Sequence, residues 1–398
     1  MRILVLADHY LPGFRAGGPI RTLANLVDRL GREYEFRIVA RDRDLGDMSP
    51  YPGVETGVWK REARAEIFYL EPGLAGLRQI HRLLAAGDYD LLYLNSAFSP
   101  ARTLWPLLLQ RLRLAPRRSC LIAPRGEFAA GALATKGVKK QTFLNMARLF
   151  GLYDDVAWQT SSSHDAADLR HQFDVPQERL FIVPNLPRRS EVAPRSVRPA
   201  SPGLSVVFLG RVAPIKNLDY ALDVLSRVDE PVSFTIYGPI EDHAYWHACQ
   251  ARMARLPPQI RARYAGEVSP EQVSDVVSKH DLLLLPTRGE NFGHVIAECL
   301  QAGTPVLISD QTPWRDLEAA NAGWDLPLAK PEAFISAITR LARESDQDRA
   351  ERRRAAAAFA DLMLDPPRIE QATRRMFELC ANCGAARHQG LSAHLNRL

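Results

Sequence analysis

The sequence predicts an α/β protein with two doubly wound domains that face each other across a cleft. Three observations predict this class: the length of 398 residues, two series of short apolar runs alternating with helical periodicity, and a proline-rich stretch between them. A chain of this length exceeds one ordinary hydrophobic core, so more than one domain is expected. Continuous apolar runs separated by helices indicate parallel strands that helices cover on both faces.

The apolar runs give the predicted strands of each domain. The first series lies at 2–8, 35–40, 66–70, 90–95, 119–124, 156–161 and 180–184, and the second at 204–210, 232–238, 262–266, 281–286 and 304–309. In open parallel sheets, ligands bind outside the carboxyl ends of the strands. Motifs that directly follow the strands are therefore the candidates for function.

A linker rich in proline and charge, from Leu186 to Gly203, separates the two series. We expect a first domain over residues 1–190, a second over 203–365, and a C-terminal helix and tail over 366–398 that returns to the first domain. The helices expected near the end of the chain are Glu351–Leu364 and Pro367–Leu379.

Composition excludes several classes of protein. The apolar fraction of 46% and the charged fraction of 24% are those of a globular protein, and no apolar run reaches the roughly eighteen residues of a membrane span. The net charge of +5 comes without a basic face carrying interleaved aromatic residues, so we expect no nucleic-acid partner. A strand-like start and five cysteines favour the cytoplasm.

The C-terminal tail carries a cysteine and histidine pattern that partly matches a zinc site. Cys380 and Cys383 have the spacing of a zinc-binding pair, but His388 and His394 follow much sooner than in a zinc finger. A polar tail is the alternative reading, and we favour it over a metal site.

The first functional motif follows the strand predicted at 204–210. Gly210 allows a sharp turn, and Arg211 and Lys216 then lie on the loop before a helix that starts near Asn217. Two cations beside a helix N-terminus suit a diphosphate, although two solvated loop charges would give the same pattern.

The second motif, "TRGENFGHVIAE", places Glu290 before a helix that starts near Phe292 and Gly293, and Glu298 about two turns later. The positive end of that helix dipole points to the same edge of the sheet. One carboxylate at the helix mouth and one inside the helix fit an extended ligand with hydroxyl groups at both ends, such as a nucleotide-sugar. The alternative is a helix cap at Glu290 and a surface residue at Glu298.

These motifs resemble those of the retaining "group 1", or family 4, glycosyltransferases with the GT-B fold of two Rossmann-like domains. The matching segments are "GRVAPIKN", Tyr237-Gly238-Pro239, "YAGEV" and "GENFGHVIAECLQAGTPVLISD", the last similar to the Glu-x7-Glu signature of that family. In the first half, Gly17-Gly18, "APRGEF" and "VPN" continue the resemblance more loosely.

The resemblance implies roles for single residues. Arg211 and Lys216 would hold the donor diphosphate, Glu290 the hydroxyls of the donor sugar, and Glu298 those of the ribose. Arg211, Lys216 and Glu290 form the expected catalytic set. The other expected donor-binding residues are Gly210, Tyr237, Gly238, Glu267, Asn291, Phe292, Gly293, His294, Val295 and Glu298. We interpret His294 as a residue of the helix start rather than a base.

The resemblance also makes the first domain the acceptor-binding domain. Gly17 and Gly18 precede a helix and would let backbone amides approach a phosphate or sugar, unless they form a turn that binds nothing. Arg125 lies where the family often has a histidine that contacts the donor sugar. Arg125 could bind a charged substrate and Glu127 could serve as a polar contact, or the two could form a structural ion pair.

Lys136, Lys139 and Lys140 share one face of a predicted helix, and apolar residues from Phe143 to Phe150 follow. Such a segment could rest on an anionic bilayer or could be an ordinary surface helix. A peripheral contact with the inner face of the membrane is therefore expected alongside a cytoplasmic location.

The expected function is a metal-independent, retaining transfer of a sugar from a UDP- or GDP-linked donor to a glycan or lipid-linked glycan of surface polysaccharide synthesis. We expect no cofactor, because no Asp-x-Asp motif lies in the predicted donor site and the family generally works without bound metal. A nucleotide-sugar epimerase and a non-catalytic nucleotide-sugar-binding subunit are the alternatives.

Overall fold

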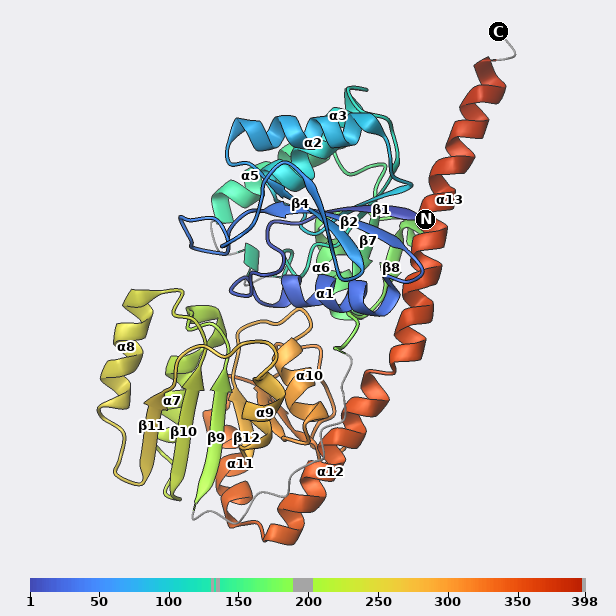
Figure 1. Cartoon of the computed structure of the whole chain (residues 1–398). Coiled ribbons are helices and arrows are strands. Elements are labelled where there is room, and N and C mark those ends of the chain that lie inside the picture. Colours follow the sequence, from blue (N-terminus) through green and yellow to red (C-terminus); the bar gives the residue numbers. More distant parts are fainter. Residues whose placement is uncertain (130–131, 134–136, 189–202, 396–398) are drawn as a thin grey trace. The chain divides into compact units, whose positions relative to one another are not determined.

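The computed structural model describes residues 1–398 except 130–131, 134–136, 189–202 and 396–398, and it leaves out the side chains of 137–139 and 383–395. The chain divides into two compact units: Met1–Arg189 with Pro366–Leu398, and Ser190–Asp365. Each unit is a sheet of mostly parallel strands with helices on its faces (Figure 1). The predicted fold class is confirmed.

The first unit contains one sheet in the strand order β3-β4-β2-β1-β5-β6-β7-β8 among the residues described. The strands are β1 (Arg2–Leu6), β2 (Glu35–Arg41), β3 (Trp59–Glu62), β4 (Ala65–Leu70), β5 (Leu91–Leu94), β6 (Ser119–Ile122), β7 (Ala157–Thr160) and β8 (Leu180–Ile182). All pairs are parallel except β3 with β4. The order reverses between β1 and β5, which makes the carboxyl ends of these two strands a topological switch point.

Helices cover both faces of this first sheet. They are α1 (Gly18–Leu30), α2 (Leu74–Ala86), the π-helical η1 (Pro100–Leu104), α3 (Trp105–Arg111), α5 (Gly137–Leu149), α6 (Ser163–Gln172), the short 3-10 helix η2 (Gln177–Arg179) and α13 (Pro366–Leu395). One core lies between the sheet and α1 and α13, and a second lies on the opposite face under α2, α3, α5 and α6.

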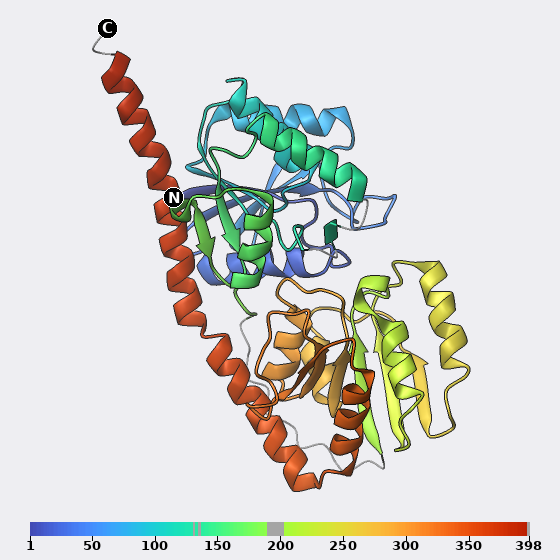
Figure 2. The same cartoon turned by 180° about the vertical axis from the view of Figure 1, so that it is seen from behind.

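The last helix, α13, runs along the first unit although it comes after the second in sequence (Figure 2). Its Phe377 is fully buried, and the ring packs edge-on at 5.5 Å from Tyr34 and 5.8 Å from Tyr93. Arg374 adds an ion pair with Glu33 at 2.7 Å. Burial of this aromatic ring therefore packs the last helix against the N-terminal part of the chain.

The second unit contains a fully parallel sheet in the order β11-β10-β9-β12-β13-β14. Its strands are β9 (Leu204–Leu209), β10 (Val232–Tyr237), β11 (Ile260–Tyr264), β12 (Leu282–Leu285), β13 (Val306–Ser309) and β14 (Gly323–Leu326). Its helices are η3 (Pro214–Lys216), α7 (Leu218–Leu225), α8 (His243–Met253), α9 (Val273–Ser278), α10 (His294–Gln301), α11 (Pro331–Arg343) and α12 (Asp346–Met363). The strand order is the dinucleotide-fold order 3-2-1-4-5-6, with its switch point between β9 and β12.

Every predicted run overlaps a strand, but β3 and β14 were not predicted. The residues of β3, Trp-Lys-Arg-Glu, are mostly polar and form an antiparallel edge, so they give no apolar run. The four residues of β14 begin with a glycine, and only two of them are buried.

Candidate active site

The two motifs singled out in the second half of the chain meet at the switch point of the second sheet. Gly210 and Arg211 directly follow β9, and the segment from Pro286 to Glu290 follows β12, its neighbour. Because ligands of open α/β sheets bind at such a point, this is the place where the fold itself favours a site.

Hydrogen bonds hold the two loops together. The Arg288 backbone N–H donates to the Ile215 carbonyl at 2.8 Å, and the Thr287 hydroxyl donates to the same carbonyl at 3.0 Å. The side-chain amide of buried Asn217 donates to the Pro286 carbonyl at 2.9 Å and accepts from Arg288 Nε at 3.0 Å. Asn217 has a φ of 61°, a left-handed conformation that asparagine tolerates better than most residues.

Lys216 and Glu290 form an ion pair across these loops, with Lys216 Nζ donating to Glu290 Oε1. Both side chains are largely buried, at 15% and 13% exposed. The side chain predicted to bind the phosphate and the side chain predicted to bind the sugar are therefore in contact with each other. Arg211, at the edge of the site, pairs with Glu241, and both of those side chains are partly exposed.

Glycines bring the backbone of adjacent strand ends close together. Gly238 follows β10 with a φ of 136°, and a Cβ placed there would lie 1.9 Å from the Gly210 carbonyl oxygen. The Gly238 carbonyl accepts from the Tyr264 hydroxyl at 2.9 Å. Tyr237 before it is half-buried, with its ring 6.3 Å from that of His280, and Glu267 is exposed beyond β11.

The start of α10 is fixed by Gly293, which has a φ of 75° and whose carbonyl accepts from the N–H of Ala297. Phe292 is buried, and its carbonyl accepts from the indole N–H of Trp314 at 2.6 Å. The His294 ring packs edge-on against Phe292 at 4.8 Å, as expected of a residue at the helix start. These contacts aim the positive end of the α10 dipole at the switch point.

The remaining predicted residues lie on the same segment. Asn291 is half-buried in the loop before α10, Val295 is half-buried in its first turn, and Glu298 is half-buried in its second turn. Glu290 precedes the helix, and its backbone N–H donates to the Gln311 carbonyl at 3.0 Å. The two glutamates therefore lie at the mouth of α10 and inside it, as the spacing predicts.

In the first unit, Gly17 has a φ of 71° and directly precedes α1, which starts at Gly18. A Cβ at Gly17 would meet no atom within 4 Å, so a glycine is favoured here by the backbone conformation and not by a lack of space. Asp44 holds the loop by accepting from the backbone N–H groups of Phe14 and Arg15 at 2.8 and 3.1 Å.

Arg125 is engaged in hydrogen bonds within the first unit. Its guanidinium donates to Asn95 Oδ1 and to the Tyr93 hydroxyl, each at 2.7 Å, and to Asn185 Oδ1 at 2.7 Å. Its φ of 54° is a left-handed conformation that is uncommon for a residue with a side chain. Arg125 thus links the loop after β5 to the segment after β8, and its predicted substrate contact stays a prediction.

Glu127 lies apart from those Arg125 contacts and is partly buried. Its carboxylate accepts from the Ala97 N–H at 2.5 Å and from the Ser96 hydroxyl at 2.7 Å. Burial raises the pKa of Glu127 to about 7, against these hydrogen bonds, which lower it.

Parts of the tail and of the lysine cluster lie outside the described residues. Cys380 is buried in the core of the first unit, whereas the side chains of Cys383, His388 and His394 are not described. Lys136 and the side chain of Lys139 are likewise outside, and Lys140 Nζ donates to the Ala132 carbonyl at 2.6 Å.

The described residues contain no cluster of three or more histidine, cysteine or acidic side chains arranged to hold a metal ion. No helix in the described part of the chain is both long and apolar enough to cross a bilayer.

Comparison with known sequences points to one family. Residues 203–344 match the family model described as "Glycosyl transferases group 1". The chain is 26% identical over 327 residues to a phosphatidyl-myo-inositol mannosyltransferase of Mycobacterium leprae, covering 77% of this chain and 78% of that protein. A D-inositol 3-phosphate glycosyltransferase of Corynebacterium efficiens is 25% identical over 163 residues, or 37% of this chain and 38% of that protein.

Solved structures share the fold. A structure of Anabaena Alr3699/HepE in complex with UDP and glucose superposes with a TM-score of 0.68 at 17% identity, covering 95% of this chain and 99% of that one. WaaG, a glycosyltransferase involved in lipopolysaccharide biosynthesis, superposes with a TM-score of 0.65 at 15% identity, covering 90% and 95%.

Two doubly wound sheets with these strand orders, and the likeness to these solved structures, define the GT-B fold. The chain resembles the group 1 glycosyl transferases, whose family model matches residues 203–344.

Proposed function

We propose that the chain is a retaining glycosyltransferase that moves a sugar from a nucleotide-diphosphate sugar to a saccharide or lipid-linked glycan. The observation that carries the proposal is the Lys216–Glu290 pair at the β9/β12 switch point, beside the start of α10. There, a cation that can bind the diphosphate and a carboxylate that can bind sugar hydroxyls contact each other. The sugar complex of Anabaena Alr3699/HepE, a protein with the same fold, supports a nucleotide-sugar as donor.

The donor would lie across the switch point with its parts distributed over named residues. Lys216 and Arg211 bind the diphosphate, Glu290 the sugar hydroxyls, and Glu298 the ribose hydroxyls. The segment from Asn291 to Val295 meets the sugar and phosphate, and Gly210, Tyr237, Gly238 and Glu267 line the nucleoside. Gly238 lies so close to Gly210 that no side chain fits between them, which supports a surface of bare backbone beside the nucleoside.

Chemically, the bond between the anomeric carbon and the diphosphate oxygen breaks, and its electron pair leaves with the diphosphate. Lys216, Arg211 and the positive end of the α10 dipole stabilise that charge as it develops. The acceptor hydroxyl attacks the same face of the oxocarbenium-like sugar and passes its proton to the departing phosphate. Configuration is thereby retained without an enzyme nucleophile, and the cations replace a metal ion.

The first unit would bind the acceptor, with the Gly17-Gly18 loop at the start of α1 and Glu127 near the β1/β5 switch point among its contacts. We place the acceptor among glycan or lipid-linked intermediates of surface polysaccharide synthesis. The likeness to phosphatidyl-myo-inositol mannosyltransferases supports a lipid-linked acceptor, and that to WaaG supports a surface glycan.

A lipid-linked acceptor would bring the first unit to an anionic membrane surface. Met146, Leu149 and Phe150 at the end of α5 are 52%, 80% and 60% exposed, and Leu112 and Leu114 after α3 are 57% and 52% exposed. The two groups adjoin, because Arg111 donates to the Gly151 carbonyl at 2.6 Å. Residues 111–118 hold four arginines and no acidic residue, which complements an anionic headgroup layer.

The test is a panel of UDP- and GDP-linked sugars incubated with the full chain without acceptor. A transferase hydrolyses its donor slowly to free sugar and nucleoside diphosphate. Conversion to an epimer would identify an epimerase, and binding without turnover would identify a non-catalytic subunit. Either of the last two results contradicts the proposal.

A further inference from the structure

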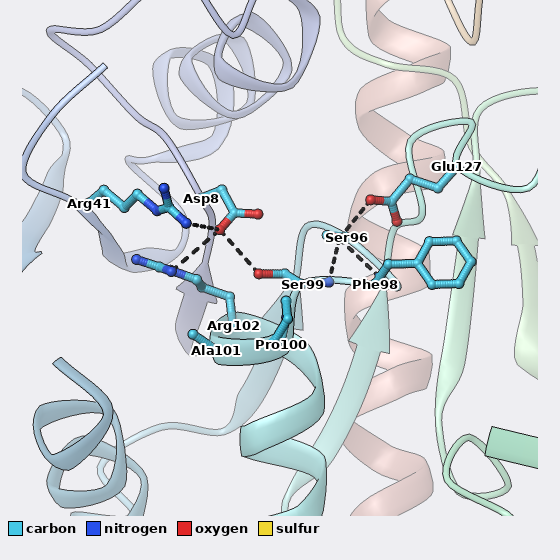
Figure 3. A pocket seen from close by; sticks show the side chains of 9 residues that line it. All are labelled: Asp8, Arg41, Ser96, Phe98, Ser99, Pro100, Ala101, Arg102 and Glu127. Carbon is cyan, nitrogen blue, oxygen red and sulfur yellow. Dashed lines mark hydrogen bonds and ion pairs between the residues drawn. The ribbon is translucent and has the colours of Figure 1, made fainter. Parts of the chain in front are cut away.

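A cavity of about 370 Å³ lies in the first unit, and the residues that line it all belong to that unit. Its lining residues follow four adjacent strands: Asp8 after β1, Arg41 at the end of β2, the segment from Ser96 to Arg102 after β5, and Glu127 after β6 (Figure 3). The cavity thus lies at the topological switch point of this sheet and has the size of a small-molecule site.

The polar groups of this cavity centre on Asp8. One oxygen of its carboxylate, Oδ1, accepts from the Ser99 hydroxyl at 3.1 Å (Figure 3). The same oxygen lies 3.5 Å from Arg102 Nη1 and 4.0 Å from Arg41 Nη2. Two guanidinium groups therefore share a single carboxylate oxygen at distances longer than a strong hydrogen bond.

Arg102 is the less common feature, because nine-tenths of its side chain is buried. Its Nε has no hydrogen-bond partner among the described residues. A guanidinium carries five N–H donors and is costly to bury without acceptors. The π-helical turn η1 nevertheless holds it at the cavity wall, where it lies 3.5 Å from the Asp8 carboxylate.

The charges that line the cavity do not balance. Arg41 and Arg102 contribute two positive charges and Asp8 contributes one negative charge, and below neutral pH the Glu127 carboxyl is mostly protonated because burial raises its pKa to about 7. One positive charge is left to be compensated. The Ser96 and Ser99 hydroxyls also line the cavity, and a serine hydroxyl can form hydrogen bonds with the hydroxyls of a sugar.

We propose that this cavity is an acceptor subsite that binds the anionic group, a phosphate or a carboxylate, of a charged sugar between Arg41 and Arg102. The anion would accept from both guanidinium groups on the side that Asp8 leaves open, and the sugar ring would lie along Ser96 and Ser99. The identification of this ligand as the acceptor rests on the proposed transferase function, whereas the anion site itself does not.

The test is calorimetric titration of the full chain with glucose 6-phosphate, glucuronate, glucose and inorganic phosphate, without any donor. At least one charged sugar should bind about tenfold or more tightly than glucose, and which of the two does so distinguishes a phosphate from a carboxylate ligand. Arg41→Gln and Arg102→Lys should each weaken that ligand by about 10- to 100-fold, because charge-assisted or two-point contacts are lost.

Arg78→Gln, at an exposed position on α2, is the matched control and should bind as the parent chain does. The half-exposed side chain of Arg41 makes its variant the safer one for folding. Charged sugars that bind no better than glucose, or that bind both cavity variants with parental affinity, would overturn the site. Inorganic phosphate binding as tightly as the charged sugar would overturn the acceptor role.

Donor hydrolysis measured on the same samples separates the two proposals. The variants could lose charged-sugar binding while the parent chain turns over no nucleotide-sugar. That result would uphold the anion site and reject the transferase. Donor turnover by a parent chain that binds no charged sugar would do the reverse.

Discussion

At the scale of single residues, the proposed donor site depends on the pair formed by Lys216 and Glu290. They neutralise each other before any ligand arrives, and both are largely buried. A diphosphate entering the site would draw Lys216 toward itself and free Glu290 to accept from sugar hydroxyls. The pair thus keeps two costly charges satisfied in the free protein and makes both available to the donor.

Replacing Lys216 by alanine should lower donor turnover more than it lowers nucleoside diphosphate affinity, because the cation is needed most as negative charge develops on the leaving group. A fall in kcat of about 100-fold or more is expected from the loss of one such contact. Steady-state hydrolysis and calorimetry give the two quantities. Lys279→Ala, an exposed lysine on the same unit, is the control. Parental turnover in Lys216→Ala would remove this side chain from the mechanism.

Glu127 supplies a prediction about pH. Its folded pKa of about 7 lies above its ordinary value of 4.5, because burial outweighs its hydrogen bonds, and the Asp8 charge adds to the rise. The stability that its protonated form contributes is therefore complete below about pH 4.5 and is lost as the pH rises to about 7. The loss amounts to about 3 kcal/mol.

Scanning calorimetry of the parent chain and of Glu127→Gln between pH 5 and pH 8 measures this effect. The amide mimics the protonated acid, so the transition of the first unit should lose less stability over this range in the variant than in the parent chain. Parallel curves for the two proteins would show that Glu127 titrates near its ordinary pKa.

Sequence reasoning indicated the charged residues of the proposed donor site but missed the residues that hold them. The motif indicated Lys216, Glu290 and Glu298 because charges at strand ends stand out from an apolar background. Asn217 was noted only as the start of a helix, and its left-handed conformation and bond to Pro286 depend on a strand some seventy residues later. Such contacts become visible only once the neighbours of each strand are known.

The arginines of the cavity were missed for a related reason. Arg41 and Arg102 are unremarkable in a chain with many arginines, and they come together only through the order of β2, β1 and β5. Asp8 was noted as the end of the first strand, without a role. Arg125, in contrast, was singled out by its motif, and the structure engages its guanidinium in bonds to Asn95, Tyr93 and Asn185.

At the scale of elements, periodicity predicted strands better than helix ends. The helix expected at Glu351–Leu364 begins at Asp346, since Ser345 and Asp348 form a capping box that satisfies the first N–H groups. The helix expected at Pro367–Leu379 continues to Leu395.

The exposed apolar end of α5 gives a prediction at this scale. A Leu149→Ser, Phe150→Ser double variant should lose most of its binding to vesicles of phosphatidylglycerol and phosphatidylcholine, because burial of these side chains in the bilayer drives contact. Co-sedimentation measures it, and donor hydrolysis in solution should be unchanged. Met48→Ser, at a site that is 88% exposed elsewhere on the same unit, is the control. Parental binding by the double variant would place any membrane contact elsewhere.

At the scale of the whole molecule, the second unit is inserted into the first. The chain leaves the first unit after β8, builds the second, and returns as α13 to pack Phe377 against Tyr34 and Tyr93. Two covalent connections therefore join the units, and the C-terminal helix belongs to the core of the first. A variant that loses the Phe377 ring would be expected to loosen the first unit.

The full chain should turn over its donor in the presence of EDTA, because in the proposed mechanism Lys216, Arg211 and the α10 dipole stabilise the departing diphosphate. Hydrolysis rates with excess EDTA and with added magnesium or manganese measure this directly. Turnover that EDTA abolishes and a divalent cation restores would mean that a metal ion carries the charge assigned here to the side chains.

The most direct test of the donor site is calorimetry with UDP and GDP on Glu298→Gln and Glu290→Gln. Glu298→Gln should weaken the preferred nucleotide by about 10- to 100-fold, the value of one charge-assisted bond to ribose. Glu290→Gln should bind it with parental or slightly higher affinity, since the nucleotide lacks the transferred sugar and Lys216 is released from its partner. Glu318→Gln, exposed on the same unit, is the control. Equal weakening by both substitutions would contradict the assignment of the nucleotide to one glutamate and of the sugar to the other.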